Sequence, residues 1–276
     1  MEFRGATQIQ AERVTIEIAE GVAEVTLNRP DKLNALDSAM FEAIIAAGES
    51  LSRIAGLRAV VLAGAGKGFC AGLDKETFAS IAARGASALG DLAQRTHGIA
   101  NAFQEAAYVW RMLPVPVIAA IHGVALGGGF QIALGADIRY VAPDARLAIL
   151  EIKWGIVPDM GGIALMRELA RSDVIRELAM TGRIFSGAEA LAYGFATSLH
   201  ADPLAAARAT AKEIAARNPD AVRAIKRLLN DATDSDARAI LLAESKEQAA
   251  LIGSLNQIEA VRAGIEGRPG LFKERE

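Results

Sequence analysis

The order of apolar and polar positions in the first half of the chain predicts strands separated by loops and helices. Residues 14–28, VTIEIAEGVAEVTLN, alternate apolar and polar positions on both sides of Glu20-Gly21, which is typical of a β-hairpin. Residues 57–65 (LRAVVLAGA) and 115–123 (VPVIAAIHG) are almost entirely apolar and predict two buried strands. Together these segments indicate a sheet with a buried centre.

Helices are expected between these strands. Asp37 or Ser38 stands where a cap is needed for a helix that runs to about Ile54. The pattern over 79–112 predicts a mostly helical stretch, and a short helix is expected at 128–135, GGFQIALG, directly after the second buried strand.

The second half of the chain becomes progressively helical. Two short strands are expected at 137–142 and 146–150. Ser186 and Glu189 form a capping box, and Gly194 stands where a C-terminal cap belongs. From about Pro203 onward, alanine-rich amphipathic helices are expected to the end. Strands that alternate with helices over roughly 200 residues predict an α/β architecture with a helical appendage.

Composition narrows the functional classes. The 276 residues are 52% apolar and 23% charged. The formal net charge of −3 gives no positive electrostatic field that would attract nucleic acid, so no nucleic-acid partner is expected. The single cysteine, Cys70, excludes an internal disulfide and fits a reducing cytosol, so a cytoplasmic protein is expected. The first residues lack the apolar stretch of a secretory signal.

One apolar segment has the length of a membrane span. Residues 113–136 carry no carboxylate, lysine or arginine. They do contain Pro114, Pro116, His122 and several glycines, and they divide into a β-rich half and a helical half. A buried strand, turn and helix is therefore expected here, and no membrane association.

Several familiar sites are excluded by their details. In GAGKGFCAG, residues 64–72, Gly68 follows Lys67 where a nucleoside-triphosphate loop needs Ser or Thr. His97, His122 and His200 lie far apart in the sequence, so no metal site is expected. The chain also lacks the G-x-S-x-G elbow of a serine hydrolase.

Two glycine-bearing loops remain, FCAGLD at 69–74 and ALGGGFQIAL at 125–134. Glycines allow a ligand to lie against the backbone, and the first amides of a helix have no internal acceptor. Two convergent backbone amides form an oxyanion hole, in which one donor typically contributes about 3 kcal/mol to lowering a barrier. The alternative is a tight turn with close packing between helix and strand.

Five ordered motifs resemble the crotonase superfamily, also called the enoyl-CoA hydratase/isomerase family. They are LNRPDKLNAL, GFCAGLD, IAAIHGVALGGGFQIALGADIRYVA, EIKWGIVPDMGG and TGRIFSGAEALAYGF, and the resemblance extends from about Val14 to Ala196. It implies a spiral of β-β-α units, an acyl-CoA substrate, and a homotrimer or dimer of trimers. It also implies that the backbone amides of Leu73 and Gly128 bind the thioester oxygen. On this basis residues 1–200 form the core that holds the acyl-CoA site, and residues 201–276 form a helical region for oligomerisation that also covers the site.

The resemblance assigns the catalytic positions as well. Hydratases of the family hold water with two glutamates. The first position is Gln131 here, which cannot titrate but can still orient a water molecule or a substrate carbonyl, and the second is Glu151. Asp159 follows where many hydratases have glycine. Glu151 with Asp159 resembles the dienoyl-CoA isomerases, and Glu151 alone resembles the simpler enoyl-CoA isomerases. Double-bond isomerisation is therefore expected, with enoyl-CoA hydration and a non-catalytic acyl-CoA-binding subunit as alternatives.

Each of these polar residues also has a purely structural interpretation. Asp159 stands where it can cap a helix in MGGIALMREL. Gln131 can be a buried polar residue that is satisfied by neighbouring backbone. Glu151 comes at the end of an apolar strand, where burying a carboxylate without a function is costly, so a functional role is favoured.

For the CoA moiety, the resemblance indicates the loops 29–35 and 71–75. The residues implied are Arg29, Lys32, Leu33, Ala35, Ala71, Asp74 and Lys75. Lys32 and Lys75 can meet CoA phosphates as mobile charges or can be ordinary solvated lysines. Phe272 and Lys273 occupy tail positions that often contact CoA in the family. No separate cofactor is expected, because CoA is part of the substrate.

Overall fold

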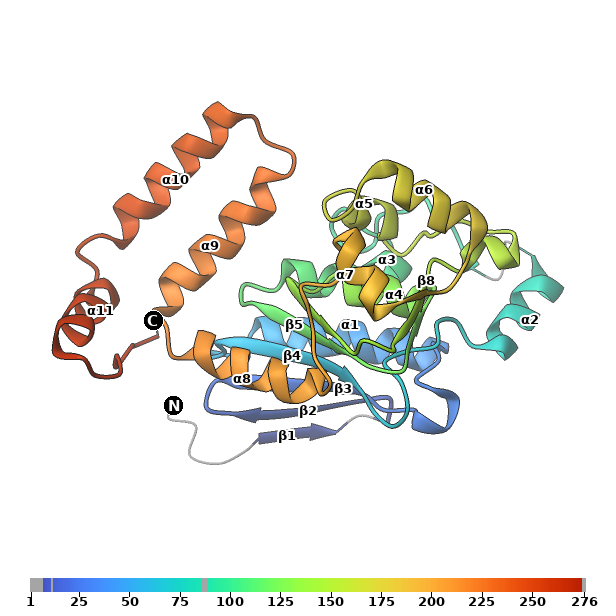
Figure 1. Cartoon of the computed structure of the whole chain (residues 1–276), viewed down its shortest axis with the longest axis horizontal. Helices are drawn as coiled ribbons and strands as arrows, with labels where there is room; N and C mark the ends of the chain where they lie inside the picture. The colour runs from blue at the N-terminus through green and yellow to red at the C-terminus, as the bar shows by residue number, and fades with distance from the viewer. Residues whose placement is uncertain (1–6, 11, 86–88, 275–276) are drawn as a thin grey trace.

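The fold is organised around a seven-stranded sheet. The computed structural model describes residues 7–10, 12–85 and 89–274. The strand order is β1-β2-β3-β4-β5-β7-β10, antiparallel from β1 to β3 and parallel from β3 onward (Figure 1). The strands are β1 (Thr7–Gln10), β2 (Val14–Ala19), β3 (Val22–Leu27), β4 (Ala59–Gly64), β5 (Val117–Ile121), β7 (Ile138–Val141) and β10 (Ser198–Leu199).

A smaller sheet contains β6 (Val124–Leu126), β8 (Arg146–Ala148) and β9 (Phe185–Ser186). The chain enters the two sheets in alternation: β5 and β7 belong to the large sheet, and the strands that follow them, β6 and β8, belong to the small one. A helix follows each pair. The predicted spiral of β-β-α units is therefore confirmed.

Eleven α-helices are described, together with short 3-10 turns that include η1 (Pro30–Lys32) and η3 (Glu151–Trp154). The helices of the core are α1 (Ser38–Ser52), α2 (Lys75–Arg84), α3 (Ala102–Met112), α4 (Gly128–Leu134), α5 (Gly162–Met166), α6 (Ser172–Thr181) and α7 (Gly187–Tyr193). The C-terminal helices are α8 (Pro203–Ala215), α9 (Pro219–Ala232), α10 (Ala237–Leu251) and α11 (Leu255–Glu266).

Local signals set several of these boundaries as predicted. Glu20 and Gly21 both have positive φ, of 52° and 76°, as a two-residue hairpin turn requires. Asp37 caps α1 by accepting a hydrogen bond from the amide of Met40 (2.8 Å). The capping box of Ser186 and Glu189 is present at the start of α7. These parts of the fold follow from neighbouring residues alone.

The prediction of a mostly helical stretch over 79–112 is wrong for its middle part. Helix α2 ends at Arg84, and α3 begins only at Ala102. The residues from 89 to 101 are irregular, and Gly90 and Gly98 adopt positive φ there. Asn101 then caps α3 in a capping box with Gln104. Residues 86–88 of the predicted stretch lie outside the described residues.

The large sheet is packed on both faces, because alternate residues of a strand point to opposite sides. In β4, Val60 and Leu62 belong to the main core, whereas Ala59, Val61 and Ala63 belong to a second cluster. Helix α8 covers that second face with Ala207 and Ala211, so the predicted helical region begins with a helix that packs on the sheet.

The last three helices extend away from the two sheets (Figure 1). A buried lysine, Lys226, fastens α9 to the core: its ammonium donates to the carbonyls of Trp110 (3.1 Å) and Val115 (3.0 Å) and to Asp137 Oδ2 (2.7 Å). All three of its donors are therefore satisfied. Helix α10, by contrast, buries none of its residues. Within the described part of the chain, no helix is both long enough and apolar enough to cross a bilayer.

Candidate active site

The two glycine-bearing loops come together next to the start of α4. The amide of Cys70 donates to the carbonyl of Val124 (3.0 Å), and the amide of Leu126 donates to the carbonyl of Cys70 (3.0 Å). A Cβ on Gly129 would lie only 2.4 Å from the carbonyl oxygen of Cys70, which explains why a glycine stands there. The close packing of helix and loop that the sequence left as an alternative is therefore present.

Two backbone amides lie at this junction. A Cβ on Gly72 would be 2.5 Å from the carbonyl oxygen of Leu126 and 3.5 Å from the amide nitrogen of Gly128, so the turn before Leu73 lies directly against the start of α4. The structure gives neither the Leu73 amide nor the Gly128 amide an acceptor among the described residues. Two unpaired donors on adjoining loops are the components that an oxyanion site requires.

The loop that carries the Leu73 amide is held in place by a third loop, which includes residues 33–36. The amide of Ala71 donates to the carbonyl of Leu33 (2.9 Å), the amide of Leu36 to the carbonyl of Gly72 (2.8 Å), and the amide of Asp74 to the carbonyl of Leu36 (3.0 Å). The predicted CoA loops 29–35 and 71–75 thus run side by side. Their arrangement is held by backbone hydrogen bonds at three places.

Asn34 is a structural residue that sequence reasoning missed. Its side chain is fully buried; its amide group donates to the carbonyls of Ala65 and Gly68 (2.9 Å each), and its oxygen accepts from the amide of Arg29 (2.8 Å). Asn34 also has a positive φ of 56°, a conformation that asparagine tolerates better than most residues. The signal in the sequence was an asparagine inside an otherwise apolar stretch, LNAL.

The charged residues among the predicted CoA contacts fall into two groups. Arg29 donates to Asp74 Oδ2 (2.6 Å) and to the carbonyl of Ala35 (3.1 Å), so both charged groups join the two loops. The charge of Arg29 and the hydrogen bond from the amide of Glu76 help to lower the pKa of Asp74 against the opposing effect of burial. Lys32 and Lys75 are exposed on the same two loops, and the Lys32 ammonium lies 3.8 Å from Glu76 Oε1.

Glu151 is the buried carboxylate beside this junction. It begins η3, just after β8, and only 7% of its surface is exposed. A Cβ on Gly127 would lie 3.3 Å from Glu151 Oε1, so the carboxylate is adjacent to the residue that precedes the Gly128 amide. Gln131 Nε2 donates to Oε1 at 2.6 Å, whereas Oε2 is buried without a partner among the described residues. One oxygen of the carboxylate therefore accepts a hydrogen bond, and the other has no partner among the described residues.

Burial raises the pKa of Glu151, and the negative charge of Asp159 adds to the increase. The hydrogen bond from Gln131 acts in the opposite direction. The pKa of Asp159 is also raised by desolvation, although part of its side-chain surface is exposed to solvent. Two carboxyl groups with raised pKa values, one of which also raises the pKa of the other, are typical of a functional site.

The structural interpretation of Asp159 does not hold. Helix α5 begins at Gly162, its N-cap is Gly161 with a positive φ of 82°, and no side chain caps it. Gln131 was also interpreted as a buried polar residue that neighbouring backbone satisfies. This is true of its oxygen, because Oε1 accepts hydrogen bonds from the amides of Met160 and Gly162 (2.9 Å each). Its other half contacts Glu151, as described above.

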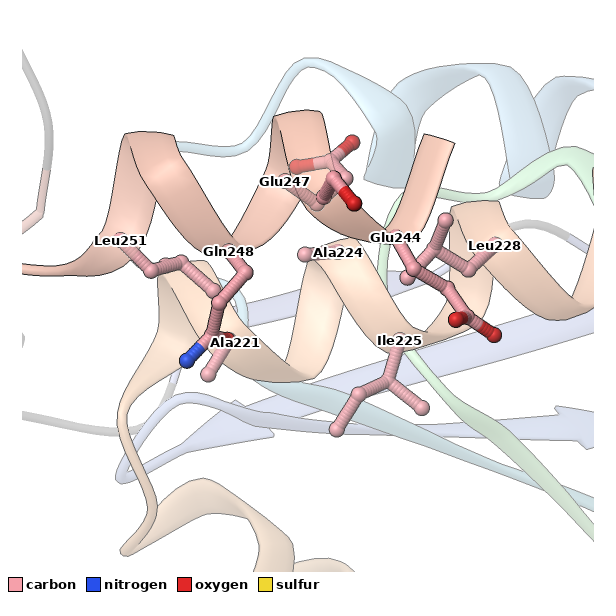
Figure 2. Close-up of a pocket in the computed structure, with 9 residues that line it drawn as sticks. Ala221, Ala224, Ile225, Leu228, Glu244, Glu247, Gln248 and Leu251 are labelled. Carbon is pink, nitrogen blue, oxygen red and sulfur yellow. The ribbon is translucent and has the colours of Figure 1, made fainter. Parts of the chain in front are cut away.

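A separate groove lies between α9 and α10 and has a volume of about 490 Å³ (Figure 2). Figure 2 shows Leu228 of α9 beside Glu244 of α10, and Ala221 of α9 beside Gln248 of α10. These helices stand well apart from α4 in Figure 1, so the groove is distinct from the junction at Glu151. In the described residues, no group of three or more His, Cys, Asp or Glu is arranged to hold a metal ion.

Comparison with known proteins identifies the family. A family model described as enoyl-CoA hydratase/isomerase matches residues 17–275. Human mitochondrial Δ(3,5)-Δ(2,4)-dienoyl-CoA isomerase is 32% identical over 252 residues, which are 90% of this chain and 77% of that protein. The structures of enoyl-CoA hydratases from Bacillus anthracis and Mycobacterium marinum superpose with TM-scores of 0.86 and 0.81 at 29% and 31% identity, and each match covers 95% of this chain and 99% of the other.

The chain belongs to the enoyl-CoA hydratase/isomerase family, within the crotonase superfamily. The resemblance seen in the sequence is thereby confirmed for family and fold. Its relatives include proteins named for isomerisation and proteins named for hydration, so the reaction has to be inferred from the site.

Proposed function

We propose that the protein isomerises a double bond in an enoyl-CoA or dienoyl-CoA through a thioester enolate. The observation that carries the proposal is the buried carboxylate of Glu151 beside Gly127, with one unpartnered oxygen, next to the amides of Leu73 and Gly128. These amides hold the thioester oxygen, and Glu151 moves the proton.

The chemistry accounts for both components. Removing a proton from the carbon next to the thioester carbonyl places negative charge on the carbonyl oxygen. Two fixed donors stabilise that charge more than the neutral ground state, which lowers the barrier. With a 3-enoyl-CoA, Glu151 takes a proton from C2 and returns it to C4, while the double bond moves from C3–C4 to C2–C3. No atom is gained or lost, and no cofactor is required.

The apolar surface next to Glu151 fits an acyl chain. Ile152, Trp154, Ile156 and Val157 follow Glu151 in the chain and are all exposed. Phe78 of α2 stacks on Trp154 with ring centroids 4.5 Å apart, which extends the apolar surface across two elements. Exposed apolar patches of this kind usually mark binding sites. The CoA moiety is assigned to loops 29–35 and 71–75, where the exposed Lys32 and Lys75 meet its phosphates.

Hydration is the less favoured reaction because only one of the two water-holding positions is an acid. Gln131 cannot titrate, and its oxygen already accepts two backbone hydrogen bonds. The test compares two substrates for the wild-type enzyme: a 3-enoyl-CoA or 3,5-dienoyl-CoA should be isomerised, and a 2-enoyl-CoA should be hydrated much more slowly. Rapid hydration would overturn the preference, and tight binding of every acyl-CoA without turnover would indicate a binding subunit.

Asp159 is the second acid/base, and its removal gives a pH-dependent prediction. Because its charge raises the pKa of Glu151, Asp159→Asn should lower that pKa, and the acid limb of the 3-enoyl-CoA profile should shift to lower pH. The base must be ionised to accept a proton, so wild-type activity rises with pH through this limb. Turnover of a 3,5-dienoyl-CoA should fall by about 10²–10⁴-fold, because that reaction needs the second group.

The control for this variant is Asp144→Asn, which makes the same change in an exposed turn. The control should leave the acid limb and both turnover numbers unchanged. An unmoved acid limb in Asp159→Asn, together with wild-type turnover of the dienoyl substrate, would remove Asp159 from the mechanism.

A homotrimer or a dimer of trimers is the proposed assembly. The last three helices expose a series of large apolar side chains: Ile225, Leu229, Leu241, Leu242, Leu255, Ile258, Val261 and Ile265. A monomer rarely leaves so much apolar surface in water. Light scattering at micromolar concentration should give a mass three or six times that of the 29.0 kDa chain, and a monomeric mass would contradict the assembly.

A further inference from the structure

Gln131 makes a set of contacts that the proposed reaction does not yet explain. The side chain is 1% exposed and points from α4 toward the segment 159–162 on one side and Glu151 on the other. Oε1 accepts from the amides of Met160 and Gly162 at 2.9 Å each, and Nε2 donates to Glu151 Oε1 at 2.6 Å. A Cβ on Gly162 would lie 2.5 Å from Gln131 Oε1, so glycine is needed for this close approach.

These partners fix which end of the amide faces Glu151. Two backbone N–H groups can only be satisfied by an oxygen, so the carbonyl end must face the segment 159–162. The NH₂ end then faces the carboxylate. An amide in this orientation has no carbonyl lone pair left to orient a water molecule or to receive a substrate proton.

We propose that Gln131 is a positioning residue that occupies Oε1 of Glu151 and thereby leaves Oε2 as the single oxygen that carries the proton. The inference rests on the proposed isomerisation. In the described residues Oε2 is buried and has no hydrogen-bond partner, so no neighbouring donor competes with a substrate proton for its lone pairs. Gln131 supplies the orienting hydrogen bond without adding a second titrating group at this position.

The same side chain couples the two acids. By binding the amides of Met160 and Gly162, Gln131 holds the backbone on either side of Gly161, immediately after Asp159. One residue therefore determines both the orientation of the Glu151 carboxylate and the course of the segment that carries Asp159.

Few other charges act on Glu151. Among the described groups, Asp159 is the one whose charge contributes to the raised pKa of Glu151. The ammonium of Lys153 on η3 lies over the ring of Trp154. Helix α6, which also packs on η3, carries Asp173, Arg176 and Glu177. These three are engaged with Arg171, Ser172 and Arg183, respectively. A change at residue 131 is therefore the most direct way to alter the carboxylate.

The test uses one variant that changes only the NH₂ half of the Gln131 amide and one that removes both halves. Gln131→Glu keeps an oxygen for the two backbone amides but places a carboxyl group against Glu151. Gln131→Leu removes both halves. For each variant, kcat and KM for a 3-enoyl-CoA are measured across pH, with Gln248→Glu on the distant helix α10 as the matched control.

In Gln131→Glu the two carboxyl groups should share one proton, because like charges at this distance cannot both ionise easily. The protonated partner imitates the amide, so activity should persist at intermediate pH. It should fall by at least about 10-fold on an alkaline limb that the wild type lacks. In Gln131→Leu, kcat should fall by about 10²-fold with little change in KM, and the acid limb should shift to higher pH, because a hydrogen bond that lowers the pKa of Glu151 is lost.

A residue that only holds the loop would behave differently. Gln131→Leu would then lose stability but keep the wild-type kcat in the fraction that folds, and this result would overturn the inference. A wild-type pH profile in Gln131→Glu would also overturn it, because the two carboxyl groups would then not interact. Should Gln131→Leu fail to fold, Gln131→Glu still decides the question. Failure of the proposed function can be distinguished from failure of this inference, because in that case the wild-type enzyme itself does not isomerise the 3-enoyl-CoA.

Discussion

Glu151→Gln is expected to lose at least about 10³-fold in turnover of a 3-enoyl-CoA or 3,5-dienoyl-CoA. General acid–base groups typically contribute about 10²–10⁴-fold, and Glu151 performs both proton transfers with a 3-enoyl-CoA and one of the two with a 3,5-dienoyl-CoA. An amide has nearly the same shape as the carboxylate, but it can neither accept nor release the proton. The loss should therefore appear in kcat, measured by absorbance of the conjugated product.

Binding should survive this substitution. The new amide keeps an oxygen that can accept the hydrogen bond from Gln131 Nε2, so the local structure has little reason to change. The Kd for an unreactive acyl-CoA and the melting temperature should both remain close to the wild-type values. Glu244→Gln makes the same chemical change in the groove between α9 and α10 and should leave turnover intact. Wild-type kcat in Glu151→Gln would end the mechanism.

Gly72→Ala should produce the second large effect, through the backbone. Gly72 has a φ of +82°, and a Cβ there would lie 2.5 Å from the carbonyl oxygen of Leu126. Because that atom belongs to the backbone of a neighbouring strand, the loop itself must move, and it carries the Leu73 amide. Displacing one oxyanion donor typically costs about 3 kcal/mol of barrier, so kcat should fall by about 10²-fold or more.

A control variant separates the backbone strain in Gly72→Ala from the clash with Leu126. Gly253 has a φ of +78°, but a Cβ there would meet nothing within 4 Å. Gly253→Ala should therefore show only the cost of a side chain in the left-handed region, about 1–2 kcal/mol in the free energy of unfolding. Gly72→Ala should lose more stability than this control, and it alone should lose kcat. A folded Gly72→Ala enzyme with wild-type kcat would remove the Leu73 amide from the site.

The parts of the fold that local chemistry determines could be predicted from the sequence. The hairpin at Glu20-Gly21, the cap at Asp37 and the capping box at Ser186 each depend on residues within one turn of each other. The irregular segment 89–101 was missed because its apolar spacing imitates a helix, while Gly90 and Gly98 turn the backbone away from helical geometry.

For the candidate site, the sequence predicted which residues take part but not how they contact one another. Glu151 was recognised as costly to bury, but its contact with Gln131 joins residues 20 positions apart. Asn34 binds carbonyl groups 31 and 34 positions away, and the stretch LNAL indicates a buried asparagine but not these partners. The orientation of the Gln131 amide likewise depends on Met160 and Gly162, which approach it only after the spiral has formed.

The most direct measurement is a crystal structure with an unreactive acyl-CoA analogue. The account predicts that the thioester oxygen lies about 2.7–3.1 Å from the amide nitrogens of both Leu73 and Gly128, with Oε2 of Glu151 facing C2 of the acyl chain. A thioester bound elsewhere, for example in the groove between α9 and α10, or a Glu151 carboxylate turned away from C2, would contradict it.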